Sequence, residues 1–194
     1  LASTAVFAEP DMARQSSNKS GLFIGVDAFQ GESNLDLELS GLVSGSADKD
    51  FDQSGFRIKI GKQGHNGSRF QVYFKSEDFD DAFDENVYGF GADYLKTFSV
   101  NQSFQPFLLI GGLLDWTELD DSAINYSEDS LNAVGLKLGL GGLFQVHDSV
   151  EIQAGFDWQY RSWQDITFTD GMSSVTVEQS DTSTTFYAGL NFLF

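Results

Sequence analysis

Hydrophobic and polar residues alternate along most of this chain, with a period of two that recurs in eight separate segments. A period of two is typical of a β-strand whose two faces have different surroundings. The eight predicted strands are residues 22–29, 56–61, 70–75, 87–95, 107–116, 135–146, 150–161 and 185–194. The sequence therefore predicts an all-β fold.

The composition of the two strand faces indicates which face meets lipid. One face is uniformly apolar and rich in Phe, Tyr, Trp and Leu, whereas the opposite face holds ten charged residues and most of the strand glycines. A soluble barrel buries its apolar face, but a transmembrane barrel turns that face outward. Residues 21–194 are therefore predicted to form an eight-stranded antiparallel up-and-down transmembrane β-barrel. A soluble calyx around a hydrophobic ligand is the alternative outside the membrane class.

The ten inward charges comprise five bases and five acids, so the predicted interior is neutral. They are Asp27, Arg57, Lys59, Lys75, Asp93, Asp115, Lys137, Glu151, Asp157 and Arg161. A lone charge in an interior of low dielectric is costly, and equal numbers of both signs allow pairing. Side chains fill the lumen of an eight-stranded barrel, so we expect this network to plug it.

The predicted connections alternate long and short, as the long external loops and short periplasmic turns of outer-membrane barrels do. The long ones, residues 30–55, 76–86, 117–133 and 162–184, hold 21 acids and one base. The formal charge of −18 is thus concentrated at one rim, which argues against nucleic acid as a partner. We expect the four acidic loops to contact divalent cations, lipopolysaccharide or a protein partner.

Aromatic residues gather near both ends of the predicted strands. Trp116, Trp158, Tyr160 and Trp163 lie near the external ends, and Phe98, Phe104, Phe144 and Phe194 lie near the opposite ends. Aromatic side chains favour membrane–water interfaces, so these eight residues are predicted to form two aromatic belts.

The first residues have the features of a secretory signal peptide near its cleavage site. Val6 and Ala8 are the small residues expected three positions and one position before such a site. Residues 1–8 are therefore interpreted as a signal-peptide remnant, and residues 9–20 as a flexible lead-in to the barrel.

The C-terminal segment TFYAGLNFLF carries apolar residues at alternate positions and ends on phenylalanine. These positions are Phe186, Ala188, Leu190, Phe192 and Phe194. Together with the opening segment GLFIGVDAF, it resembles the small eight-stranded outer-membrane barrels, namely the OmpA transmembrane domain and OmpX-like proteins. The resemblance implies a location in the outer membrane of a Gram-negative bacterium. It also implies that the barrel-assembly machinery recognises the last strand.

Candidate catalytic and metal-binding residues are few, because the chain has no cysteine and two histidines. His147 and Ser149 form a His-x-Ser pair similar to that of the PagL lipid A deacylases, but they lie in a predicted three-residue turn. His65 has no second candidate catalytic residue at a matching position of the pattern. The segment DKDFDQSG begins like a calcium loop, yet Gln53 replaces its glycine and Lys59 its final glutamate. We therefore expect no catalytic site, no metal site and no cofactor.

These features together predict a structural, surface-presenting protein whose barrel anchors four acidic loops. A narrow channel of the OmpW kind, for ions or small hydrophobic solutes, is the alternative hypothesis. A lipid-modifying enzyme is the third. The three differ in single-channel conductance and in their effect on lipid A.

Overall fold

The computed structural model describes residues 21–41, 44–64, 67–79, 86–98, 103–118, 130–170 and 173–194. These residues form the strands β1 (Leu22–Gly41), β2 (Gly45–Gln63), β3 (Ser68–Phe79), β4 (Val87–Thr97), β5 (Phe104–Glu118), β6 (Ser130–His147), β7 (Val150–Trp163), β8 (Ile166–Asp170) and β9 (Ser173–Leu193). None of the described residues belongs to a helix that could cross a membrane. The interpretations of residues 1–8 and 9–20 concern a segment outside the described residues.

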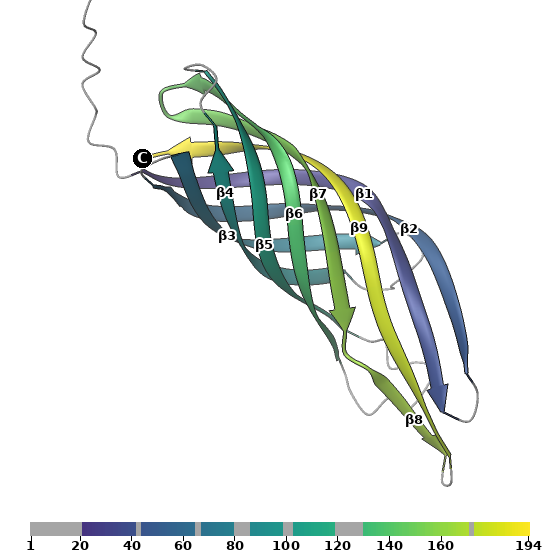
Figure 1. The fold of residues 1–194 in the computed structure, drawn as a ribbon. Coiled ribbons are helices and arrows are strands. Elements are labelled where there is room, and N and C mark those ends of the chain that lie inside the picture. Colours follow the sequence, from purple (N-terminus) through teal and green to yellow (C-terminus); the bar gives the residue numbers. More distant parts are fainter. Residues whose placement is uncertain are drawn as a thin grey trace, which may run out of the picture.

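The sheet closes on itself because the first and last long strands pair. Neighbouring strands are antiparallel in the order β1 to β7 and then β9, and β9 pairs again with β1. At the short-turn end, the Phe194 backbone N–H donates a hydrogen bond to the Leu22 carbonyl oxygen at 2.9 Å. Figure 1 shows this ring of inclined strands, with β8 paired to β9 at the end far from the C-terminus. The fold is therefore an eight-stranded up-and-down barrel with one extra strand.

The barrel places charges inside and apolar side chains outside. On β6 the Leu136 side chain is 66% exposed, whereas its neighbour Lys137 is fully buried. The same alternation runs through every barrel strand as predicted, with Phe90 exposed and Asp93 buried on β4, for example. Such a surface is unfavourable in water but suits a bilayer, because lipid then covers the apolar side chains.

Two of the segments predicted as long loops are instead largely strand. Residues 30–39 and 45–55 continue the pairing of β1 with β2, and β9 continues along β1 as far as residue 175. The prediction was wrong because the apolar face ends at the membrane boundary, whereas backbone hydrogen bonding continues beyond it. Outside the bilayer a strand with water on its outer face no longer needs an apolar side.

The inward glycines are explained by large side chains on neighbouring strands. Five inward aromatic residues each lie directly opposite a glycine: Phe23 with Gly61, Phe29 with Gly55, Tyr73 with Gly91, Phe107 with Gly141, and Tyr187 with Gly155. A Cβ atom added to any of these glycines would lie closer than 3.0 Å to the facing ring. The glycines therefore provide the space that lets a narrow lumen hold aromatic rings.

A substitution at one of these glycines tests this packing. In Gly155→Leu the new Cβ would lie 2.6 Å from the Tyr187 hydroxyl oxygen, so we expect the free energy of unfolding to fall by about 1–3 kcal/mol. The matched control is Gly112→Leu on the outer face, where the nearest atom is 3.7 Å from the added Cβ. Urea unfolding in detergent, followed by the gel mobility of unheated samples, measures both. Equal losses in the two variants would contradict the packing argument.

Candidate functional site

Thirteen charged side chains are buried inside the described part of the barrel. Ten are the residues predicted from the sequence: Asp27, Arg57, Lys59, Lys75, Asp93, Asp115, Lys137, Glu151, Asp157 and Arg161. The other three are Arg69, Glu77 and Asp181, which the sequence interpretation had assigned to turns and loops. All thirteen take part in ion pairs with one another. The interior therefore contains six bases and seven acids rather than five of each.

Arg161 is the centre of the group nearest the long-loop end. Its Nη1 atom donates to Glu77 at 2.7 Å and to Asp115 at 3.2 Å, and its Nη2 atom donates to Asp181 at 2.7 Å. Lys75 contacts the same Glu77 and Asp115 carboxylates at 2.7 and 2.8 Å. These two bases and three acids come from four different strands, β3, β5, β7 and β9, so the group connects opposite walls of the barrel.

A second group is built around Arg57 and Lys59, two inward neighbours on β2. The Arg57 Nη1 atom donates to Asp157 at 2.8 Å, and its Nε atom lies 4.0 Å from Asp27. The Lys59 ammonium contacts Asp27 at 2.6 Å and donates to the Gln153 side-chain oxygen at 2.8 Å. The Arg57 guanidinium also lies 4.5 Å from the centre of the Tyr187 ring, so aromatic faces support its charge as well.

A third group is built around Lys137 on β6, across the barrel from β2. Its ammonium contacts Asp93 at 2.9 Å and the Tyr73 hydroxyl at 3.0 Å. It also lies 4.1 Å from the centre of the Tyr73 ring. Gln71 donates to the same Asp93 carboxylate at 2.9 Å. The charges of Lys137 and Asp93 therefore balance, as burial of a charge requires.

Arg69 and Glu151 form the group nearest the short-turn end. Both Arg69 Nη atoms donate to the two Glu151 carboxylate oxygens at 2.7 Å, which is the bidentate geometry of a strong ion pair. The Asn191 side-chain amide donates to Glu151 at 2.9 Å and to Gln153 at 3.1 Å. Gln153 in turn accepts a hydrogen bond from Lys59, so polar contacts link this group to the middle of the barrel.

Apolar residues close the lumen at the long-loop end. A buried cluster there consists of Phe51, Phe79, Val87, Leu131, Ala133 and Trp163. Beside it, a cavity lined by Trp163 and Asp181 has a volume of about 10 Å³, at the lower limit for one water molecule. Ser33, on the neighbouring strand β1, donates a hydrogen bond to the Asp181 carboxylate at 3.1 Å. Paired charges and this apolar cluster together fill the described interior at that end.

The prediction of the aromatic belts is wrong for one residue, Trp163. Trp163 is 5% exposed, and its indole N–H donates to Asp181 at 2.7 Å inside the barrel. It follows Arg161 by two positions on β7, so it shares the inward face of that strand. The other belt residues are exposed or half-buried: Trp116, Trp158, Tyr160, Phe98, Phe104, Phe144 and Phe194. The alternate positions Phe186, Ala188, Leu190 and Phe192 of β9, and Phe194 just after it, are also exposed. Their recognition by assembly machinery stays a prediction.

The same positional rule would have found the three missed charges. Arg69 and Glu77 have the parity of the inward Lys75 on β3, and Asp181 has the parity of Tyr187 on β9. They were missed because the run of apolar residues on the outward side of each strand ends before it reaches them. Inward-facing residues therefore continue along a strand beyond the last apolar residue of its lipid-facing side.

The residues with catalytic potential form a turn. His147 is exposed, and its Nδ1 atom accepts a hydrogen bond from the Ser149 backbone N–H at 3.3 Å. This contact joins the ring to the main chain, not to the hydroxyl that a nucleophile would use. His65 lies outside the described residues. The described residues contain no group of three or more His, Asp or Glu arranged to hold a metal ion.

An acidic face covers the long hairpins beyond the barrel. Three pairs of acids lie directly opposite each other on adjacent strands: Glu32 with Asp52, Asp36 with Asp48, and Glu38 with Glu178. All six residues are exposed. Like charges in this position destabilise a sheet, so the face attracts cations or a basic partner. Most of the acidic segment 77–85 lies outside the described residues.

Comparisons with known proteins agree with this architecture. The chain is similar to the crystal structure of Neisserial surface protein A, with 21% identity over 92% of this chain and 100% of that chain and a TM-score of 0.54. It is also similar to OprG from Pseudomonas aeruginosa (14% identity, 91% and 97% coverage, TM-score 0.54). The outer-membrane protein AlkL gives 13% identity, 96% coverage of both chains and a TM-score of 0.55. No protein-family model and no curated protein sequence matches the chain.

These similarities show the fold of small outer-membrane β-barrels. Together with the apolar outer surface, the fold shows an outer-membrane location and is consistent with an OmpA- or OmpX-like barrel, as the sequence predicts. In such barrels the long hairpins face outward and the short turns face the periplasm. By this rule we expect the acidic hairpin face at the external end and the Arg69–Glu151 pair at the periplasmic end.

The Arg69–Glu151 pair offers a clean test of charge pairing in the lumen. Arg69→Met leaves Glu151 buried without its cation, so we expect the free energy of unfolding to fall by about 3–5 kcal/mol. The double variant Arg69→Met/Glu151→Met should recover most of that loss. Urea unfolding in lipid vesicles measures both, and Lys49→Met on the exposed hairpin is the control. A double variant that is no more stable than the single one would contradict the argument.

Proposed function

We propose that this outer-membrane barrel is a non-catalytic, surface-presenting protein whose plugged lumen serves as a rigid anchor. The observation that carries the proposal is the acidic face on β1, β2 and β9, which extends beyond the membrane as continuous strand. A face built on paired strands has a fixed arrangement of charge, unlike an unstructured acidic loop. It is suited to binding cations, lipopolysaccharide through bridging cations, or a basic protein surface.

The contacts of the interior support an anchoring role rather than transport. The buried ion pairs form four groups within the lumen, and the Arg161 group connects β3, β5, β7 and β9. Moving a solute past Arg161 would require breaking bonds to three carboxylates at once. Such a network favours stability and orientation of the hairpins over a permanently open path.

A hollow in the acidic face gives the proposed contact a location. It has a volume of about 510 Å³ and is lined by Asp36, Glu38, Asp48, Asp165 and Glu178, with Tyr160 at its edge. Tyr160 is also one of the predicted belt residues. A partner held there would therefore lie close to the lipid headgroups, where lipopolysaccharide phosphates and their counterions are concentrated.

Charge neutralisation on this face tests the proposal. Asp48→Asn/Glu178→Gln removes two like-charge pairs, so we expect slower hydrogen exchange in residues 32–41 at low salt, equivalent to about 0.2–1 kcal/mol per pair. Adding Ca²⁺ should slow exchange there in the unmodified protein and have little effect in the variant.

The matched control for that experiment is Asp78→Asn/Glu118→Gln. It makes the same change of charge, but these two acids lie opposite Ser54 and Ser130. The control variant should keep the calcium response of the unmodified protein. Equal calcium responses in all three proteins would contradict a role for the acidic face.

Planar-bilayer recordings distinguish the anchor from a narrow channel. We expect no sustained conductance from the unmodified protein. Arg161→Ser should produce brief openings, because Glu77, Asp115 and Asp181 then repel one another across the lumen. Lys49→Ser, on the exposed hairpin, is the control. Steady conductance of the unmodified protein would overturn the plugged anchor in favour of a channel for ions or small solutes.

A further inference from the structure

One row of the lipid-facing surface consists of small residues on two adjacent strands. Ala92 on β4 lies directly opposite Gly112 on β5. The outward residues above and below them are large: Phe90 and Tyr94 on β4, and Leu114 and Ile110 on β5. Outward residues on one strand are about 7 Å apart, so this row leaves a slot wide enough for a hydrocarbon chain.

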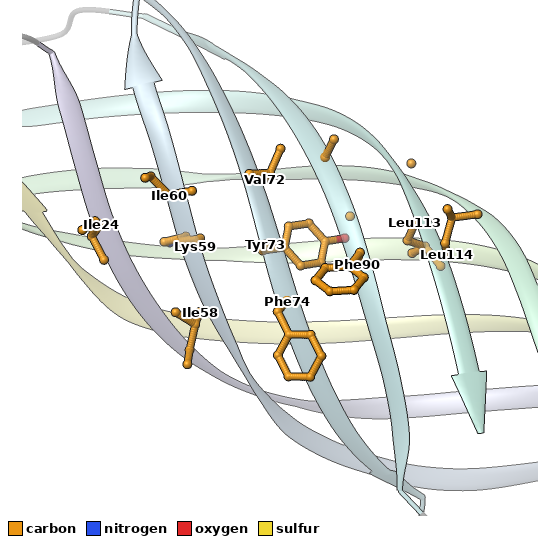
Figure 2. Close-up of a pocket in the computed structure, with 13 residues that line it drawn as sticks. Ile24, Ile58, Lys59, Ile60, Val72, Tyr73, Phe74, Phe90, Leu113 and Leu114 are labelled. Carbon is orange, nitrogen blue, oxygen red and sulfur yellow. The ribbon is translucent and has the colours of Figure 1, made fainter. Parts of the chain in front are cut away.

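The slot is part of a larger apolar groove on the outside of the barrel. The groove has a volume of about 610 Å³ and extends across β1 to β5, where Ile24, Ile60 and Val72 continue the row of Ala92. Figure 2 shows Phe74 and Phe90 beside one another along it, with Ile58 and Ile60 on the neighbouring strand. Its lining is almost entirely hydrocarbon, so an acyl chain is a better occupant than water.

Basic residues mark the periplasmic side of this groove. Lys62 follows the groove residue Ile60 by two positions on β2, and Lys96 follows Ala92 by four positions on β4. Both have the outward parity of their strands, and Lys62 is exposed. Of the nine bases in the described residues, six are inside the barrel and Lys49 is on the external hairpin. The two that remain lie on the periplasmic side of the same groove, Lys62 one outward position beyond its lining and Lys96 two outward positions beyond it.

A second row of small residues, on the opposite side of the barrel, lacks this feature. Ala154, Ala188 and Ala28 lie side by side on β7, β9 and β1. On these strands the outward residues two and four positions nearer the periplasm are all apolar, namely Ile152, Leu190, Val26, Val150, Phe192 and Ile24. Small residues alone therefore do not distinguish the groove; their combination with Lys62 and Lys96 does.

We propose that the groove is a binding site for one anionic diacyl phospholipid of the periplasmic leaflet. An acyl chain occupies the slot over Ala92 and Gly112, and the phosphate lies against Lys62 and Lys96. The periplasmic ends of β2 and β4 are at the depth of that leaflet's headgroups, where cationic side chains attract phosphate. The site is independent of the acidic external face, so the two proposals succeed or fail separately.

Native mass spectrometry of the folded full chain in detergent tests this site. The probes are phosphatidylglycerol and phosphatidylcholine with identical acyl chains, and lipid A. We expect one phosphatidylglycerol to bind on the order of tenfold more tightly than phosphatidylcholine. Lys62→Gln/Lys96→Gln should abolish that preference, whereas Gly112→Leu should weaken both phospholipids because it fills the slot.

Two variants serve as matched controls. Lys49→Gln removes one charge at the external end, and Ala154→Leu enlarges a small outward residue on the other side of the barrel; neither should change the preference. Gel mobility of unheated samples establishes that each variant is folded. The proposal is overturned if Lys62→Gln/Lys96→Gln retains the preference, if Gly112→Leu binds like the unmodified protein, or if the two lysines instead govern binding of lipid A.

Discussion

Pairing of β1 with β9 is the constraint on which the rest of this structure depends. In a bilayer each backbone N–H and C=O group needs a partner within the protein, and only closure of the sheet removes the two free edges. Closure of eight strands also fixes a narrow interior. Every inward side chain must then fit a small volume of low dielectric, which makes both size and charge critical.

The interior meets the two requirements by pairing residues across strands. Large rings such as those of Tyr73 and Tyr187 lie over glycines of the neighbouring strand, so each large inward side chain is matched by a residue that has none. Charges are likewise shared, with Arg161 contacting three acids and Arg57 two. The packing is therefore cooperative, because a substitution on one strand changes the surroundings of residues on two or three others.

The outer surface is polarised along the barrel axis. Exposed acids dominate the external hairpins, an apolar zone follows, and Lys62 and Lys96 lie toward the periplasm on one side. This order matches the surroundings of an outer-membrane protein, with cations and lipopolysaccharide outside and phospholipid headgroups inside. It also separates the two proposed contact surfaces, so the acidic face and the groove can be tested with different variants.

The sequence by itself determined the strands within the membrane and the face that each turns to lipid. This was possible because lipid imposes a strict alternation, as in Val150 to Arg161 on β7. It predicted ten of the buried charges for the same reason. It missed Arg69, Glu77 and Asp181, and misplaced Trp163, because the apolar signal ends where the membrane ends while the strand continues.

Only the tertiary structure decided which charges pair and what the glycines accommodate. The partners of Arg161 are up to 84 positions away in the sequence, and they meet because the barrel closes. The groove beside Lys62 and Lys96 likewise depends on the register that sets Ala92 opposite Gly112. Alternation fixes the face of a residue, but register and closure fix its neighbours, and neither is contained in the period of a single strand.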